Sequence, residues 1–105
     1  MGNRIPVITK ITNEKGYIEY HVNPVTGWDG FDSLTKYLIK YWQAEITESA
    51  DWIYSRRKVL RSGNVFISIY YDSQIGNYFL REDDSNNQSL LEQIEADLIR
   101  RLSDA

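Results

Sequence analysis

The chain has 105 residues, no cysteine and a formal net charge of -3, with a pI near 5.1. This length suits a single domain spanning residues 1–105. The lack of cysteine excludes disulfides and thiolate metal sites, and it predicts a cytoplasmic protein. The acidic balance argues against a chain whose main task is to hold nucleic acid. Because no stretch approaches the roughly 20 apolar residues of a membrane helix, we expect no membrane partner.

Two alternating segments at the start of the chain predict a β-hairpin. Residues 5–12 and 17–22 each alternate in side-chain character with a period of two, which is typical of strands. The polar link over residues 13–16 ends in Gly16, and glycine can take the positive φ that a hairpin turn requires.

A connection and a helix are predicted next. Residues 23–30 contain one proline and two glycines, which interrupt regular structure. Apolar residues then recur at three- and four-residue steps from Phe31 to Trp42, which predicts a helix of about three turns. Asp29 or Asp32 is placed to cap it.

The middle of the chain predicts an antiparallel meander of three or four strands. Alternation runs through residues 44–60, is interrupted at 61–64, and is clearest at 65–72. A second turn at 73–77 leads into a strand that starts at Tyr78.

A terminal amphipathic helix completes the pattern. Its apolar residues recur at helical spacing at Leu91, Ile94, Leu98 and Leu102. Ser89 and Glu92 have the spacing of a capping box. The predicted fold is therefore α+β, a two-layer sandwich in the order ββαβββα, with two helices on one face of an antiparallel sheet of about five strands.

Catalytic, metal and cofactor motifs are not found in the sequence. His21 is the only histidine, and it lies beside Glu19 in a predicted strand with no serine, cysteine or second acid at a fixed spacing. We therefore interpret it as an exposed strand histidine rather than a general base. No phosphate-binding glycine pattern and no nucleophile elbow is present, so we expect neither an enzyme nor a cofactor.

The acidic residues are densest after the predicted meander. Glu82, Asp83 and Asp84 form a run, with Asp72 in the preceding turn. Their spacing does not fit an EF-hand loop, so we expect no metal. Two interpretations stay open for this run: a solvated loop ahead of a helix, or recognition of a basic partner.

The basic residues gather in one predicted strand, at Arg56, Arg57, Lys58 and Arg61. Side chains alternate across a strand, so Arg56 and Lys58 share one face while Arg57 and Arg61 share the other. One face therefore cannot hold the whole run, and this weakens the interpretation as a nucleic-acid binder that uses nearby tyrosines for stacking.

Eight tyrosines and three tryptophans in a small acidic α+β chain are more than a core requires, and these side chains are enriched at interfaces. In size, acidity and layout the chain resembles the cytoplasmic immunity proteins of bacterial toxin/immunity systems, including contact-dependent growth inhibition. The resemblance implies a protein-binding module that neutralises a cognate toxin domain, often a basic nuclease.

Charge and aromatic character predict the partner-binding residues, which are Asp72, Glu82, Asp83, Asp84, Tyr70 and Tyr78. A cytosolic adaptor or housekeeping domain stays open as the alternative, with a nucleic-acid binder behind it.

Overall fold

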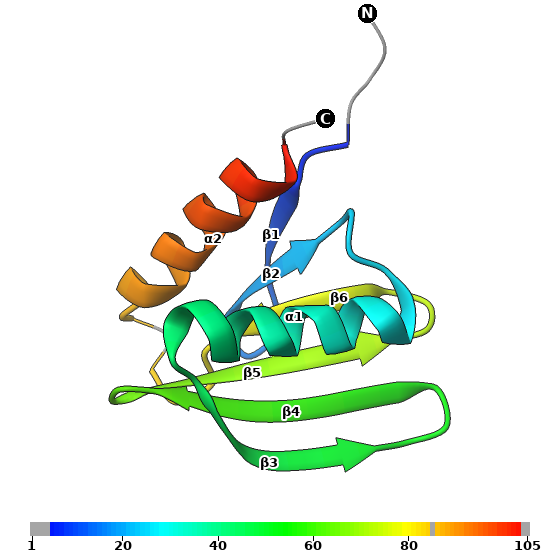
Figure 1. Cartoon of the computed structure of the whole chain (residues 1–105), viewed down its shortest axis with the longest axis horizontal. Coiled ribbons are helices and arrows are strands. Elements are labelled where there is room, and N and C mark those ends of the chain that lie inside the picture. The colour runs from blue at the N-terminus through cyan, green and yellow to red at the C-terminus, as the bar shows by residue number, and fades with distance from the viewer. Residues whose placement is uncertain (1–4, 85, 104–105) are drawn as a thin grey trace, which may run out of the picture.

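One antiparallel sheet of six strands and two helices make up the described part of the chain (Figure 1). The structure, a computed structural model, describes residues 5–84 and 86–103. In chain order the elements are β1 (Ile8–Thr12), β2 (Ile18–Val22), α1 (Gly27–Trp42), β3 (Glu45–Asp51), β4 (Ser55–Ser62), β5 (Val65–Asp72), β6 (Gly76–Leu80) and α2 (Ser89–Leu102). The α+β class, the first hairpin and the meander are confirmed.

The sheet has one strand more than predicted, and its order is β1-β2-β6-β5-β4-β3. The alternating stretch 44–60 is not one strand but two, β3 and β4, joined by a turn at residues 52–54. That turn contains no glycine or proline, so composition does not reveal it. The last strand, β6, lies between β2 and β5 and joins the N-terminal hairpin to the meander.

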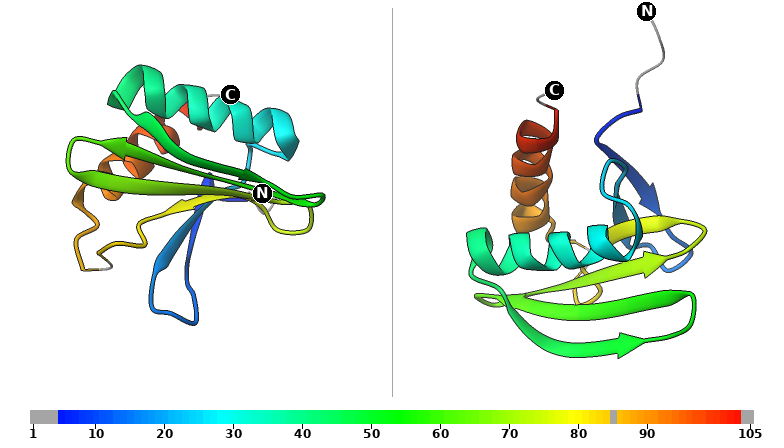
Figure 2. Two further views of the ribbon diagram at one scale, coloured as in Figure 1. Left: turned by 90° about the horizontal axis from the view of Figure 1, so that it is seen from below. Right: turned by 45° about the vertical axis from the view of Figure 1, so that its right-hand side comes forward.

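Both helices lie on one face of the sheet (Figure 2). Helix α1 begins at Gly27, earlier than predicted, and Thr26 is its N-cap residue. Helix α2 begins at Ser89 with Gln88 as its N-cap residue, and neither N-cap side chain makes a capping hydrogen bond. The predicted capping roles of the aspartates and of Ser89 are therefore wrong. Neither helix is long and apolar enough to cross a bilayer.

Gly30 lies inside α1 because the helix approaches the sheet closely there. A Cβ atom on this residue would lie 2.8 Å from Val25 Cγ1 and 2.9 Å from the Nδ2 of Asn77 in β6. Both distances are shorter than a real Cβ contact, so glycine is required for packing and does not end the helix.

The core fills the space between the helices and the sheet. Tyr20 and Phe79 stack across neighbouring strands, with ring centroids 4.9 Å apart and planes 7° apart. Fully buried side chains from both helices and from β4 and β5 surround them, namely Phe31, Leu38, Leu60, Ile67, Ile69, Leu91 and Ile94. Burying a side chain of this size stabilises the fold by roughly 1.5–3 kcal/mol. Because Leu91 and Ile94 belong to α2, this helix is part of the core.

The N-terminal hairpin leaves the plane of the sheet. Its strand β2 pairs with β6 at two positions, Tyr20 with Phe79 and His21 with Tyr78. Beyond them the hairpin projects away from the side that carries the helices (Figure 2, left). The β1–β2 hairpin therefore borders the uncovered face of the sheet on one side.

A polar cluster joins the two helices at their outer edges. The Tyr37 hydroxyl donates to Asp97 Oδ2 at 2.6 Å and accepts from Trp42 Nε1 at 2.8 Å. Arg101 Nε lies 2.7 Å from the same carboxylate, which Arg100 also contacts. The Tyr37 hydroxyl, together with these guanidinium groups, lowers the pKa of Asp97 to about 2.

We predict that replacing Ile94 by alanine lowers the free energy of unfolding by about 2–5 kcal/mol, because the side chain is fully buried between α2 and the sheet. Ile99→Ala is the matched control on the same helix, since Ile99 is exposed. Urea denaturation compares them. Equal losses for the two variants would contradict the packing described for α2.

We also predict an acid-sensitive contribution from Asp97. Its pKa is about 2 in the fold and 3.8 otherwise, so the carboxylate stabilises the fold above pH 4. That contribution, about 1–2 kcal/mol at this partly solvated site, is lost as the pH falls through about 2. Asp97→Asn should be less stable than wild type at pH 6, and the difference should shrink toward pH 2. Urea midpoints measured across this range test it, and a constant difference would contradict it.

Candidate binding face

A row of side chains crosses the face of the sheet that the helices leave uncovered. Strand register places His21 opposite Tyr78, Tyr78 opposite Tyr70, and Tyr70 opposite Arg57. These residues come from the adjacent strands β2, β6, β5 and β4. Arg56 lies on the other face, where its guanidinium covers the rings of α1. The predicted division of the basic run between two faces is confirmed.

The rings of this row are stacked on one another. The centroids of His21 and Tyr78 are 4.6 Å apart with planes 24° apart, and those of Tyr78 and Tyr70 are 5.2 Å apart with planes 12° apart. The guanidinium of Arg57 lies 5.7 Å from the Tyr70 ring. Stacking across strands restricts the rotamers of these side chains, which favours a preorganised surface.

Carboxylates fix the arginine end of the row. Arg57 Nε donates to the Tyr70 hydroxyl at 2.9 Å, and that hydroxyl donates to Glu82 at 3.1 Å. The two terminal nitrogens of Arg57 lie 3.2 Å from Glu48 and 3.5 Å from Glu82. This cation is therefore neutralised within the protein.

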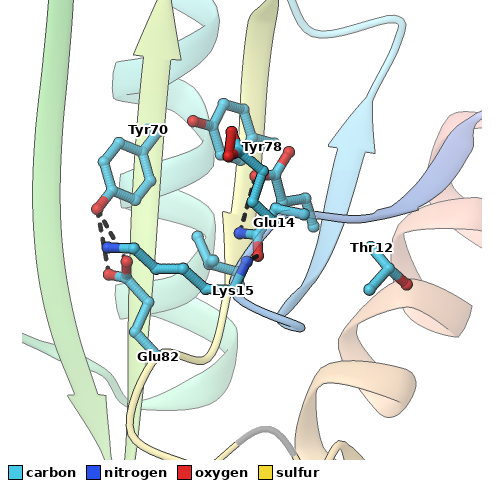
Figure 3. A pocket seen from close by; sticks show the side chains of 9 residues that line it. Thr12, Glu14, Lys15, Tyr70, Tyr78 and Glu82 are labelled. Carbon is cyan, nitrogen blue, oxygen red and sulfur yellow. Dashed lines mark hydrogen bonds between the residues drawn. The ribbon is translucent and has the colours of Figure 1, made fainter.

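A hollow of about 540 Å³ lies between the row and the tip of the N-terminal hairpin (Figure 3). Tyr70, Tyr78 and Leu80 form its floor, and Glu82 closes one side. The hairpin supplies the remaining lining residues, which are Thr12, Asn13, Glu14, Lys15 and Glu19. The hollow exists because the hairpin bends out of the sheet beside β6.

Negative charge dominates the hollow. Glu14, Glu19 and Glu82 line it, with Lys15 as the only cation among its lining residues. Burial, followed by the charge of Glu19, raises the pKa of Tyr78 to about 12. The Tyr78 hydroxyl is therefore neutral at physiological pH. No group in the described part of the chain forms a hydrogen bond with it, so it is available to bind a ligand.

Three of the predicted partner-binding residues come together here, namely Tyr70, Tyr78 and Glu82. Asp83 lies at the edge of a neighbouring hollow and is held by Arg81 Nε at 2.7 Å. The Asp84 carboxylate accepts the backbone N–H of Asn86 at 3.0 Å, so it shapes the loop before α2.

Asp72 lies apart from the other predicted residues. It ends β5 and accepts the backbone N–H of Gln74 at 2.8 Å, so it holds the turn into β6. Glu82 follows the opposite end of β6. Asp72 and Glu82 therefore lie at opposite ends of this strand, and a binding surface at one end cannot include both. The acidic residues serve two regions of the molecule.

The expected exposure of His21 is wrong. Its exposed fraction is 7%, because Tyr78 of the inserted strand β6 covers one side of the ring. Its Nε2 lies 2.8 Å from Glu19 Oε1. Sequence reasoning also missed Glu14, Glu19 and Glu48 as members of this face. The period of two in β2 places Glu19 and His21 on the same face of the sheet, so this pair could have been predicted. No sequence pattern indicates where the tip of the hairpin, which carries Glu14, lies.

The described residues contain no group of three or more histidines and carboxylates arranged to hold a metal ion. What the hollow offers is carboxylate oxygens, one free phenol and ring edges, all of which suit a cationic or hydrogen-bonding group. Comparison of the chain with protein-family models, curated proteins and solved structures finds no match. The functional argument therefore depends on this geometry.

We predict different effects from removing the two tyrosine hydroxyls. Tyr70→Phe loses hydrogen bonds to Arg57 and Glu82 and should lower the free energy of unfolding by about 1–2 kcal/mol. Tyr78→Phe loses none and should change it by less than about 0.5 kcal/mol. Urea denaturation measures both, and an equally destabilised Tyr78 variant would contradict the network described here.

Proposed function

We propose that the chain is a protein-binding module that receives a basic surface of another protein in the hollow between the β1–β2 hairpin and the open sheet face. The observation that carries this proposal is the stacked row of His21, Tyr78 and Tyr70 beside a carboxylate-lined hollow. Tyrosines whose rotamers are restricted by stacking lose less conformational entropy when a partner covers them.

The charge of the hollow favours a basic partner. Glu14 makes no ion pair within the described residues. A cationic group of a partner can therefore pair with it without breaking an internal ion pair. Glu82 is shared between Tyr70 and Arg57 and keeps the negative side of the hollow in place. A lysine or arginine of a partner would meet carboxylates on both sides of the hollow.

We further propose that this binding neutralises a toxin domain, as the resemblance to bacterial immunity proteins implies. A small acidic inhibitor that covers the cationic substrate groove of a nuclease would block it by occupying the place of the nucleic acid. The adaptor role is the alternative, and it uses the same surface. Nucleic-acid binding is disfavoured, because Arg57 is already neutralised and the hollow would repel phosphates.

The proposal is tested by co-expressing the chain with the product of the neighbouring gene and measuring the complex by surface plasmon resonance. We predict that Glu14→Lys slows association severalfold at low salt and reduces its salt dependence, because charge acts mainly on encounter. Tyr78→Ala should chiefly speed dissociation, since a buried aromatic anchor holds the complex.

Glu92→Lys is the matched control, because it makes the same charge reversal at an exposed position on α2. If it slows association as much as Glu14→Lys, net charge alone is responsible and the hollow is not the interface. A neighbouring gene product that does not bind would refute the immunity role and leave the adaptor role.

A further inference from the structure

Large apolar side chains gather on one end of the molecule, away from the hollow. This apolar end consists of Trp28, Trp52, Ile53, Tyr54 and Ile75. They come from the start of α1, the turn between β3 and β4, and the turn between β5 and β6. All three segments lie at the same end of the sheet in two views (Figures 1 and 2).

The turn between β3 and β4 carries the most exposed of these side chains. The exposed fractions are 54% for Trp52, 80% for Ile53 and 72% for Tyr54. Three consecutive large apolar residues at a turn contribute little to the core, and a polar turn would close the same hairpin. Exposed apolar side chains that gather at one end of a sheet are candidates for an interaction site.

Backbone and ring contacts hold the segments of the apolar end together. The Ser73 N–H donates to the Tyr54 carbonyl at 2.9 Å and joins the two turns. The Trp28 ring packs edge-on against Tyr71 at 6.4 Å, and the guanidinium of Arg56 lies 4.8 Å from the Trp28 ring centroid. These contacts join the two turns to each other and the start of α1 to the neighbouring strands β4 and β5.

The charges around the apolar end are mostly negative. Asp29, Asp32, Asp51 and Asp72 flank it, and Arg56 pairs with two of them, at 3.0 Å from Asp51 and 3.5 Å from Asp32. Asp29 makes no ion pair within the described residues. A second copy of the chain would bring the same carboxylates face to face, and an anionic membrane would be repelled.

We propose that the apolar end is a second docking surface, which takes a protein segment whose apolar side chains are flanked by lysine or arginine. The apolar residues supply the contact area, and the surrounding carboxylates select the basic flanks. The surface is separate from the hollow, because none of its five residues lines the hollow.

The test is a selection of random peptides displayed on phage against the immobilised protein, followed by affinity measurements on the enriched peptides. Enriched peptides should combine aromatic or aliphatic residues with lysine or arginine. Their affinity should fall about tenfold or more for the double variant Ile53→Ser/Tyr54→Ser. It should fall less for Asp29→Asn, with a weaker dependence on salt.

The double variant Ile39→Ser/Ile99→Ser is the matched control, because it removes two exposed apolar side chains from the helices. It should bind the peptides like wild type, and so should Glu14→Lys in the hollow. Equal melting temperatures for the two double variants would show that folding is not the cause of the difference.

Three outcomes would overturn the proposal. The first is a set of enriched peptides that lack basic residues or bind the Ile53→Ser/Tyr54→Ser variant as tightly as wild type. The second is no enrichment over a selection on that variant. The third is concentration-dependent self-association of the wild type that the variant abolishes, since the occupant would then be a second copy.

Discussion

The arrangement of the molecule depends on the short pairing of β2 with β6. Two residue pairs join the N-terminal hairpin to the meander, and each pair is reinforced by stacked rings, Tyr20 on Phe79 beneath the helices and His21 on Tyr78 on the open face. Because the pairing is short, the hairpin can bend out of the sheet and line one side of the hollow. The β2–β6 pairing therefore both closes the core and creates the hollow.

The two faces of the sheet have different tasks as a result. The covered face holds the apolar core and, at its margin, the cluster in which Asp97 ties α1 to α2. The open face carries ion pairs of Arg57 with Glu48 and Glu82, and of Arg61 with Glu45. A surface whose side chains are already fixed loses little entropy on binding, which suits the protein-binding role proposed for it.

Periodicity predicted most of the elements but not their neighbours in space. It could not separate β3 from β4, because the turn at residues 52–54 is apolar and lacks glycine. It could not predict that His21 is buried, because no sequence pattern places β6 beside β2. Alternation put Tyr70 and Tyr78 in separate strands, and only the strand register brought them together. Glu14 was unpredictable, since the path of the hairpin follows from packing rather than from local sequence.

Nuclear magnetic resonance provides the most direct test of the proposed binding face. Two-dimensional spectra of the labelled protein would be recorded as the co-purified partner is added, so that each backbone amide reports contact. The account predicts that the largest shifts fall on Glu14, Tyr70, Tyr78 and Glu82, with the outer surface of α2 unchanged. Shifts confined to the helices, with the open face of the sheet unaffected, would contradict it.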